Sequence, residues 1–300
     1  MQLYPCLLLE DQRTLFKLDT YWTLFMFPIA DDNPTHSSPI VTWFLIAACV
    51  AIFAWQSSLP DSAVEVVFIT YGAIPANIFG TPSGVVPPFP PEMTLVSSQF
   101  LHGGLMHLGG NMLYLYIFGD NVEAAMGHLR FLAFYIVAGI AAALTHGALA
   151  QASGIPMIGA SGAISGVLGA YLLLYPHARV RILFLPLPIP FFKIFAVPAI
   201  VVLGIWFTIQ FVSAAYSSPG GGGVAFWAHV GGFVAGVVLL PFFKQKHVAY
   251  WQSPSAEVID TRRSPAHWKR IGAGEDRSGE ASHDAPDRRK RGPWGRAGDD

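Results

Sequence analysis

A few polar side chains stand inside long apolar stretches of this sequence, where such groups are costly and therefore are candidates for function. Four of them could act together: His107, Asn111, Ser161 and His229. A serine hydroxyl becomes a nucleophile when a positioned base takes its proton, and histidine is a suitable base near neutral pH. The residue types therefore predict acyl transfer at Ser161, with His229 as the general base.

Each of these residues also has a purely structural interpretation. A serine among glycines, as in "GASG" at 159–162, more often packs between helices than attacks a carbonyl group. His229 alone fits a hydrogen-bonded core histidine or a proton relay, and His107 with Asn111 fits a bond between two helices. The other polar residues in apolar stretches are His102 and His146, which we assign to structure, and Ser165, Thr208 and Gln210, which receive no catalytic role.

The composition indicates a membrane protein. Hydrophobic residues make up 53% of the chain and charged residues only 12%, outside the range of a soluble domain. Apolar stretches of about 17–25 residues can cross a bilayer as helices, and no alternating barrel pattern is present. We therefore predict an all-α polytopic membrane protein whose six transmembrane helices cover 40–55, 100–119, 129–150, 155–175, 194–216 and 224–243.

Basic residues predict the orientation. The connecting segments 56–99, 151–154 and 217–223 contain no lysine or arginine, so all 18 basic residues fall on one side of the membrane. Because basic loops stay in the cytoplasm, we expect both the N and C termini to be cytoplasmic. The loop 56–99 is then extracytoplasmic and lies partly in the outer membrane interface.

The chain divides into three predicted parts. Residues 1–38 form an N-terminal cytoplasmic segment, in which Met26 looks like an alternative start, so that 1–25 would be an over-annotated stretch. Residues 39–243 form the six-helix core. Residues 244–300 are polar, contain glycine and proline, and are poor in aliphatic residues, which predicts a disordered cytoplasmic tail.

Three of the four candidate residues, each on a different span, fall at a similar depth in this arrangement. The second, fourth and sixth spans run inward, and His107, Ser161 and His229 lie about 8–10 Å below the outer edge at about 1.5 Å per residue. His107 and Asn111 are four residues apart and share one helical face. Small residues let helices approach closely in lipid. The glycines that would bring Ser161 to His229 in this way are Gly162, Gly166, Gly232 and Gly236.

An acyl transfer also needs hydrogen-bond donors for the developing oxyanion. The side chains of His107 and Asn111 and the backbone N–H of Ser161 are the candidates. No carboxylate lies at this depth to orient His229, so we predict a Ser–His dyad rather than a triad.

Other chemistries fit the sequence poorly. The imidazoles have no thiolate or carboxylate near them and no H-E-x-x-H pair occurs, so we expect no metal and no cofactor. Cys6 and Cys49 suggest no disulfide framework. An intramembrane aspartyl protease would need two aspartates inside its helices, and the predicted spans contain none. A small transporter or channel stays an alternative, although repeats and charged midplane residues are not found.

Three motifs resemble those of the rhomboid intramembrane serine proteases of bacterial type. They are "HGGLMHLGGNMLYLYIFGDNVE" at 102–123, "GASG" at 159–162 and "AHVGGFVAG" at 228–236. They match the H-x-x-x-N, G-x-S-G and A-H-x-x-G-x-x-x-G elements of the family, in the same order and on the corresponding helices. The resemblance covers roughly residues 26–243.

The resemblance implies a six-helix core with a water-accessible cavity open to the outer face. It makes Ser161 the nucleophile and His229 the base, and it gives His107, Asn111 and the Ser161 N–H to the oxyanion hole. Gly162, Gly232 and Gly236 match helix-contact glycines, and Glu123 matches a structural acidic position. The implied substrates are single-pass transmembrane proteins, cut near their outer ends after a small residue and without a cofactor.

Two positions depart from the family pattern. The first loop lacks a Trp-Arg pair found in many members. Ser165 stands where some members have a tyrosine that stacks on the catalytic histidine, so the orientation of His229 rests on other groups.

The sequence therefore predicts an intramembrane serine endopeptidase in a bacterial inner (plasma) membrane. Its expected partners are substrate proteins and the lipid bilayer, with no nucleic acid, and its oligomeric state is open. The alternative within the same fold is a catalytically silent protein that binds membrane clients.

Overall fold

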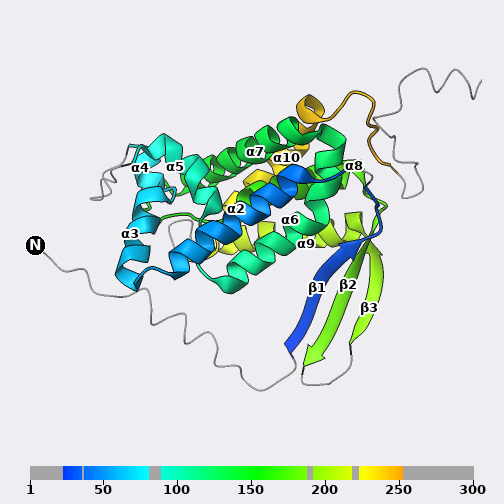
Figure 1. Ribbon diagram of the computed structural model, residues 1–300, viewed down its shortest axis with the longest axis horizontal. Helices are drawn as coiled ribbons and strands as arrows, with labels where there is room; N and C mark the ends of the chain where they lie inside the picture. Colours follow the sequence, from blue (N-terminus) through cyan, green and yellow to red (C-terminus); the bar gives the residue numbers. More distant parts are fainter. Residues whose placement is uncertain (1–22, 36, 81–88, 188–191, 218–222, 253–300) are drawn as a thin grey trace, which may run out of the picture. The chain divides into compact units, whose positions relative to one another are not determined.

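A computed structural model describes residues 23–35, 37–80, 89–187, 192–217 and 223–252 (Figure 1). The described chain is mostly helical, as predicted. A helix lies in each of the six predicted spans, and these helices are α2 (Ile40–Ser57), α6 (Leu105–Met126), α7 (His128–Leu149), α8 (Ser161–Leu174), α9 (Ala199–Tyr216) and α10 (Phe226–Phe243).

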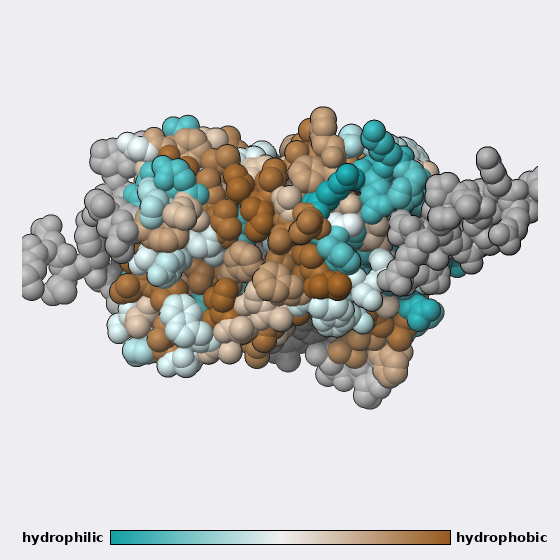
Figure 2. All heavy atoms as spheres, turned by 45° about the horizontal axis from the view of Figure 1, so that its top comes forward, coloured by the Kyte–Doolittle hydropathy of each residue, from teal (hydrophilic) through white to brown (hydrophobic). Residues whose placement is uncertain are grey.

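These helices differ in how clearly they qualify as membrane spans. Among the described residues, α2, α7, α9 and α10 are long and apolar enough to cross a bilayer. The α8 helix is apolar but only 14 residues long, and α6 has 22 residues but includes polar ones such as Asn121 and Glu123. Figure 2 shows a largely hydrophobic middle between more hydrophilic areas at the two ends. The chain is a multi-pass membrane protein.

The helices around the candidate residues begin later than predicted. The predicted fourth span, 155–175, starts as a non-helical segment because Pro156 lacks an N–H and Gly159 has a φ of 123°. The α8 helix therefore begins at Ser161 itself. The predicted second span, 100–119, is shifted in the same way, and α6 runs from Leu105 to Met126, where Gly127 with a φ of 82° ends it.

A three-stranded sheet corrects the prediction that the fold is entirely helical. Strands β1 (Thr23–Asp31), β2 (Arg179–Leu187) and β3 (Lys193–Pro198) pair antiparallel in the order β1-β2-β3. Branched and aromatic residues with interspersed prolines favour strands over helices here. The predicted fifth span, 194–216, is therefore helical only from Ala199. Strand β1 begins three residues before Met26, and the residues before Thr23 lie outside the described part.

The predicted outer loop, 56–99, contains short helices: α3 (Asp61–Tyr71), α4 (Pro75–Ile78) and α5 (Pro91–Ser97), followed by the 3-10 turn η1 (Ser98–Phe100). Figure 1 shows them at the opposite end of the helices from the sheet. An isolated bridge joins Ala73 to Met157 through two hydrogen bonds of 2.9 and 3.0 Å. This loop therefore holds the segment that leads into α8.

Glycines form the contact between α8 and α10. A Cβ atom added to Gly232 would collide with the backbone carbonyl of Gly162, and one added to Gly236 would collide with that of Gly166. A Cβ atom on Gly166 would lie 2.5 Å from the Cβ atom of Ala138 in α7. The structure thus places the four predicted helix-contact glycines where α7, α8 and α10 meet.

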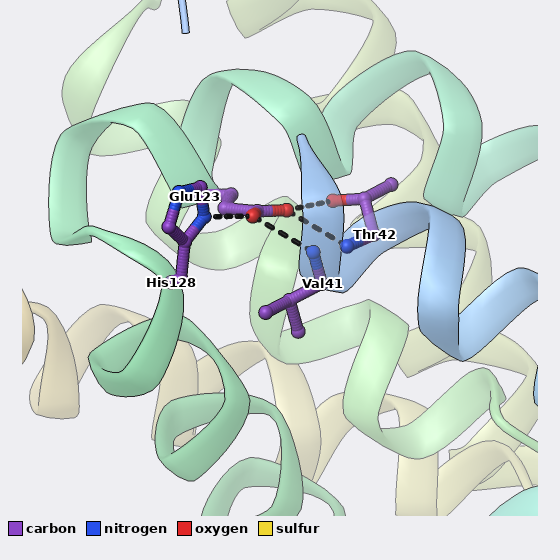
Figure 3. A network of polar contacts seen from close by, with 4 residues as sticks. All are labelled: Val41, Thr42, Glu123 and His128. Carbon is purple, nitrogen blue, oxygen red and sulfur yellow. Dashed lines mark hydrogen bonds and ion pairs between the residues drawn. The ribbon is translucent and has the colours of Figure 1, made fainter. Parts of the chain in front are cut away.

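Glu123 links three helices near the end of α6 (Figure 3). Its two carboxylate oxygens accept hydrogen bonds from the N–H groups of Val41, at 2.9 Å, and Thr42, at 2.7 Å. The Thr42 hydroxyl donates a third, at 2.7 Å, and Nδ1 of His128 lies 2.6 Å away. The α2 helix has no side-chain cap of its own. Glu123 therefore caps it by accepting bonds from its free N–H groups.

A second polar cluster joins β1 to α6 and α8. The Tyr171 hydroxyl donates to the Asp31 carboxylate at 2.5 Å, and Nδ2 of Asn121 donates to it at 3.1 Å. Nδ2 of Asn33 in turn donates to Oδ1 of Asn121 at 2.5 Å. Burial is the main reason that the pKa of Asp31 is raised from 3.8 to about 7.

The first residues of the predicted tail pack on the helices. The N–H of Gln245 donates to the carbonyl of Ala125, and those of Trp251 and Gln252 donate to carbonyls at the end of α8. The disordered tail was predicted over 244–300, whereas residues 244–252 pack on the helices; residues beyond 252 lie outside the described part.

Candidate active site

Ser161 is the first residue of α8. The chain reaches it through Gly159, whose N–H donates to the Ser98 carbonyl at 2.9 Å. The first N–H groups of a helix have no acceptor within that helix and form its positive end. Ser161 thus presents its hydroxyl and its backbone N–H at a site that favours a developing negative charge.

His229 lies against Ser161. It is in the first turn of α10, and its Nε2 is 2.9 Å from the Ser161 Oγ. This distance is within the range for a base that accepts the proton of a nucleophile. The structure therefore brings together the two residues that the sequence paired, although they are 68 positions apart.

His107 lies beside the entry loop, which is the non-helical segment 155–160 that leads into α8. Its Nδ1 accepts a hydrogen bond of 3.4 Å from the N–H of Gly103, which leaves Nε2 as the protonated nitrogen. A Cβ atom on Gly159 would lie 2.7 Å from this Nε2 and 3.8 Å from the Ser161 Oγ. The missing side chain at Gly159 thus leaves room for the imidazole beside the nucleophile, where Nε2–H can act as a donor.

The side-chain amide of Asn111 bonds its own helix instead of pointing only toward the site of an oxyanion. Its Nδ2 donates to the His107 carbonyl at 3.0 Å, within its own helix. One amide hydrogen is left for an incoming oxyanion. The structure therefore places Asn111 next to His107 but records no contact with Ser161 among the described residues.

Gln210 is the residue that sequence reasoning missed. It lies in α9, and its Oε1 is 2.7 Å from Nδ1 of His229. The Trp206 ring, one helical turn earlier, lies 6.1 Å from the imidazole between centroids. The available signal was a lone amide in a strongly apolar helix, because intramembrane polar side chains usually have a partner.

Ser165 does not take the place of the tyrosine that some members have. Its Oγ donates to the Ser161 carbonyl at 2.6 Å, so it bonds its own helix. His102 is buried, and its backbone pairs with the side chain of Gln56 at 3.2 and 3.3 Å. The described residues contain no group of three or more histidine, cysteine or acidic side chains that could hold a metal ion.

A small cavity of about 40 Å³ adjoins Ser161. Glycine and alanine supply much of its lining, including Gly139, Ala142 and Gly162, and Ser98 and Gln99 add polar atoms. A space of this size holds a water molecule or a methyl-sized group. It excludes large side chains from this side of the nucleophile.

The comparisons with known proteins agree with this geometry. The family model for the rhomboid domain matches residues 91–246, which is just over half of the chain. The chain belongs to the rhomboid family. The match includes α6, α8 and α10, which carry the candidate residues of this rhomboid domain.

The rhomboid relatives match shorter parts of the chain. Rhomboid protein 1, mitochondrial, of Saccharomyces cerevisiae is 36% identical over 101 residues, covering 32% of this chain and 29% of the relative. Presenilin-associated rhomboid-like protein, mitochondrial, of Homo sapiens is 35% identical over 95 residues, covering 31% and 25%. RHOMBOID-like protein 5 of Arabidopsis thaliana is 39% identical over 79 residues, covering 26% and 25%.

These relatives bear on the membrane in which the protein resides. Two of the three are mitochondrial by name. The comparisons therefore support a multi-pass membrane location but not the predicted bacterial plasma membrane.

Proposed function

We propose that this protein is an intramembrane serine endopeptidase in which Ser161 is the nucleophile and His229 the general base. The observation that carries the proposal is the 2.9 Å distance between the Ser161 Oγ and the His229 Nε2 at the first residue of α8. Membership of the rhomboid family, which includes proteases of this kind, supports it.

The reaction would begin with attack of the Ser161 Oγ on the scissile carbonyl carbon while His229 Nε2 takes the hydroxyl proton. The oxyanion would accept hydrogen bonds from the Ser161 N–H and from His107 Nε2–H, with Asn111 as a further donor. His229 would then give its proton to the leaving amine, and the C–N bond breaks. A water molecule would then attack the acyl-enzyme carbonyl and give its proton to His229. The ester bond to the Ser161 Oγ would break, His229 would return the proton to this oxygen, and the product would leave with a new carboxyl group.

The short α8 helix supports cleavage beneath the membrane surface. Its 14 residues span ~21 Å at 1.5 Å per residue, whereas the hydrocarbon core is about 30 Å thick. If α8 ends at the inner boundary, Ser161 lies about 9 Å below the outer one. Transmembrane segments of single-pass proteins would then be cut near their outer ends. The cavity beside Ser161 favours a small residue next to the scissile bond.

The orientation follows from the basic residues. With the termini in the cytoplasm, the site opens to the side of the membrane opposite the basic loops. This orientation applies to a bacterial inner membrane, as predicted, and equally to another membrane with the basic segments on its inner face. The mitochondrial relatives do not support the bacterial location.

Proteolysis in liposomes tests the proposal. The full chain is reconstituted with a single-pass model substrate, beside the variants Ser161→Ala, His229→Ala and Ser165→Ala. We expect cleavage by the parent and by Ser165→Ala, because Ser165 bonds its own helix, and none by the other two. A folded parent that binds the substrate without cutting it would instead show the client-binding function.

A further inference from the structure

We propose that Gln210 is a positioning residue for the base: its side-chain carbonyl holds His229 in the tautomer that accepts the proton of Ser161. The inference rests on the proposed function. It adds a third, uncharged member to a pair that the sequence predicted to act alone.

The distances define a chain of three side chains from three helices. Gln210 Oε1 in α9 lies 2.7 Å from His229 Nδ1 in α10, and His229 Nε2 lies 2.9 Å from the Ser161 Oγ in α8. A neutral imidazole has one donor nitrogen and one acceptor nitrogen. If Nε2 is to accept the serine proton, Nδ1 must carry the hydrogen. The glutamine carbonyl accepts that hydrogen and so favours this tautomer.

The opposite tautomer would be unproductive. With its hydrogen on Nε2, the imidazole has no lone pair directed at the serine hydroxyl and cannot act as its base. Gln210 would then have to turn its amide nitrogen toward Nδ1. In the observed orientation the amide oxygen faces Nδ1, so Gln210 favours the tautomer in which Nε2 is basic, the tautomer that the carboxylate favours in a Ser-His-Asp triad.

No other described group takes this role. Among the described residues, the recorded side-chain partners of the two ring nitrogens of His229 are Gln210 and Ser161, and neither is an acid. Ser165, at the position of the stacking tyrosine, bonds the Ser161 carbonyl. Orientation therefore comes from α9, with Gln210 at the edge of the imidazole and Trp206 beside its ring.

The α9 helix, which carries Gln210, is the least buried of the helices near the site that qualify as membrane spans. It packs mainly on α10 and much less on α8. The base is thus oriented from the periphery of the described helices, so a displacement of α9 would remove its hydrogen-bond acceptor.

The test compares three variants of the full chain in liposomes. Gln210→Met keeps the size of the side chain and removes the acceptor. Gln210→Glu keeps an acceptor and adds a charge. Thr208→Val is the matched control, because the Thr208 hydroxyl bonds the Gly204 carbonyl in its own helix. For each, kcat, KM and their pH dependence are measured, together with the rate of fluorophosphonate labelling.

We expect Gln210→Met to lower kcat and the labelling rate about 10–100-fold, with little change in KM. Gln210→Glu should recover part of kcat, and its acidic limb should move to higher pH because a negative charge favours the imidazolium form. Thr208→Val should behave as the parent.

Two results would overturn the inference while leaving the protease intact. One is parental kcat and pH profile in Gln210→Met, and the other is a folded Gln210→Glu that is as slow as Gln210→Met. A folded parent that neither labels nor cleaves would overturn the proposed function together with this inference.

Discussion

Two clusters of polar residues lie toward opposite ends of α6, and they differ in how many of their hydrogen-bonding groups have partners within the protein. At the C-terminal end, Glu123 is 1% exposed and its oxygens accept three hydrogen bonds and contact His128. Asn121 joins Asp31 and Asn33 in the same region. Among the described residues, these groups have their partners within the protein.

In the cluster at the N-terminal end of α6, only some of the hydrogen-bonding groups have a partner within the described protein. His107 accepts one long hydrogen bond through Nδ1, and its Nε2 faces the entry loop. The N–H groups at the start of α8 have no acceptor within the helix. Polar groups that are satisfied by one another stabilise a fold, whereas groups that retain capacity can bind a reacting substrate. The comparison thus separates structure from chemistry on one helix.

The largest effect on stability is expected for Glu123→Ala. The change leaves the N–H groups of Val41 and Thr42 and the Thr42 hydroxyl without their acceptor. At about 1 kcal/mol for each lost bond, the protein should be about 3 kcal/mol less stable. Thermal unfolding in detergent measures this, and Glu123→Gln, which retains one acceptor oxygen, should lose less. An unchanged midpoint in Glu123→Ala would show that the cap is not structural.

Asn111→Ala should lower catalysis and leave stability almost unchanged, the opposite of Glu123→Ala. If its free amide hydrogen reaches the oxyanion, its removal should lower kcat about 100-fold. Its one recorded bond is local, to the His107 carbonyl in the same helix, so the unfolding midpoint should change little. Steady-state cleavage and thermal unfolding of the same preparation measure both quantities. A loss of stability with unchanged kcat would place Asn111 with the structural cluster.

A dependence of stability on pH is expected from Asp31. Its folded pKa is raised from 3.8 to about 7, chiefly by burial. Between these values the folded protein keeps a proton that the unfolded chain has lost, so stability should fall as pH rises from about 4 to about 7. Asp31→Asn cannot ionise and should flatten this dependence, whereas Asp61→Asn, at the exposed start of α3, should not. If the stability of Asp31→Asn depended on pH as steeply as that of the parent, another titrating group would be responsible for the pH dependence.

The sequence predicted the helical regions and which candidate site residues lie close together, because both leave strong local signals. Long apolar stretches mark the spans, and the three motifs mark Ser161, His229 and His107 on their helices. Glycines at the contact positions, such as Gly232, indicated which helices approach closely. These signals depend on residue type and spacing along the chain, which the sequence displays directly.

The remaining features depend on contacts that spacing does not reveal. Apolar content alone does not distinguish the strand Lys193–Pro198 from the helix that follows it, so the sheet was missed. The φ angle of Gly159, which lets α8 begin at Ser161, is set by the fold around the entry loop. The partner of Gln210 lies on another helix, 19 residues away, and no motif connects the two.

The most direct measurement is the site of covalent labelling in the purified full-length chain. A fluorophosphonate reacts with an activated serine, and mass spectrometry of the digested protein identifies the modified residue. We expect the adduct on Ser161 in the parent and its absence in His229→Ala, with Ser165 unmodified in both. A folded parent without an adduct, or with the adduct on another serine, would contradict the assignment of Ser161 as the nucleophile.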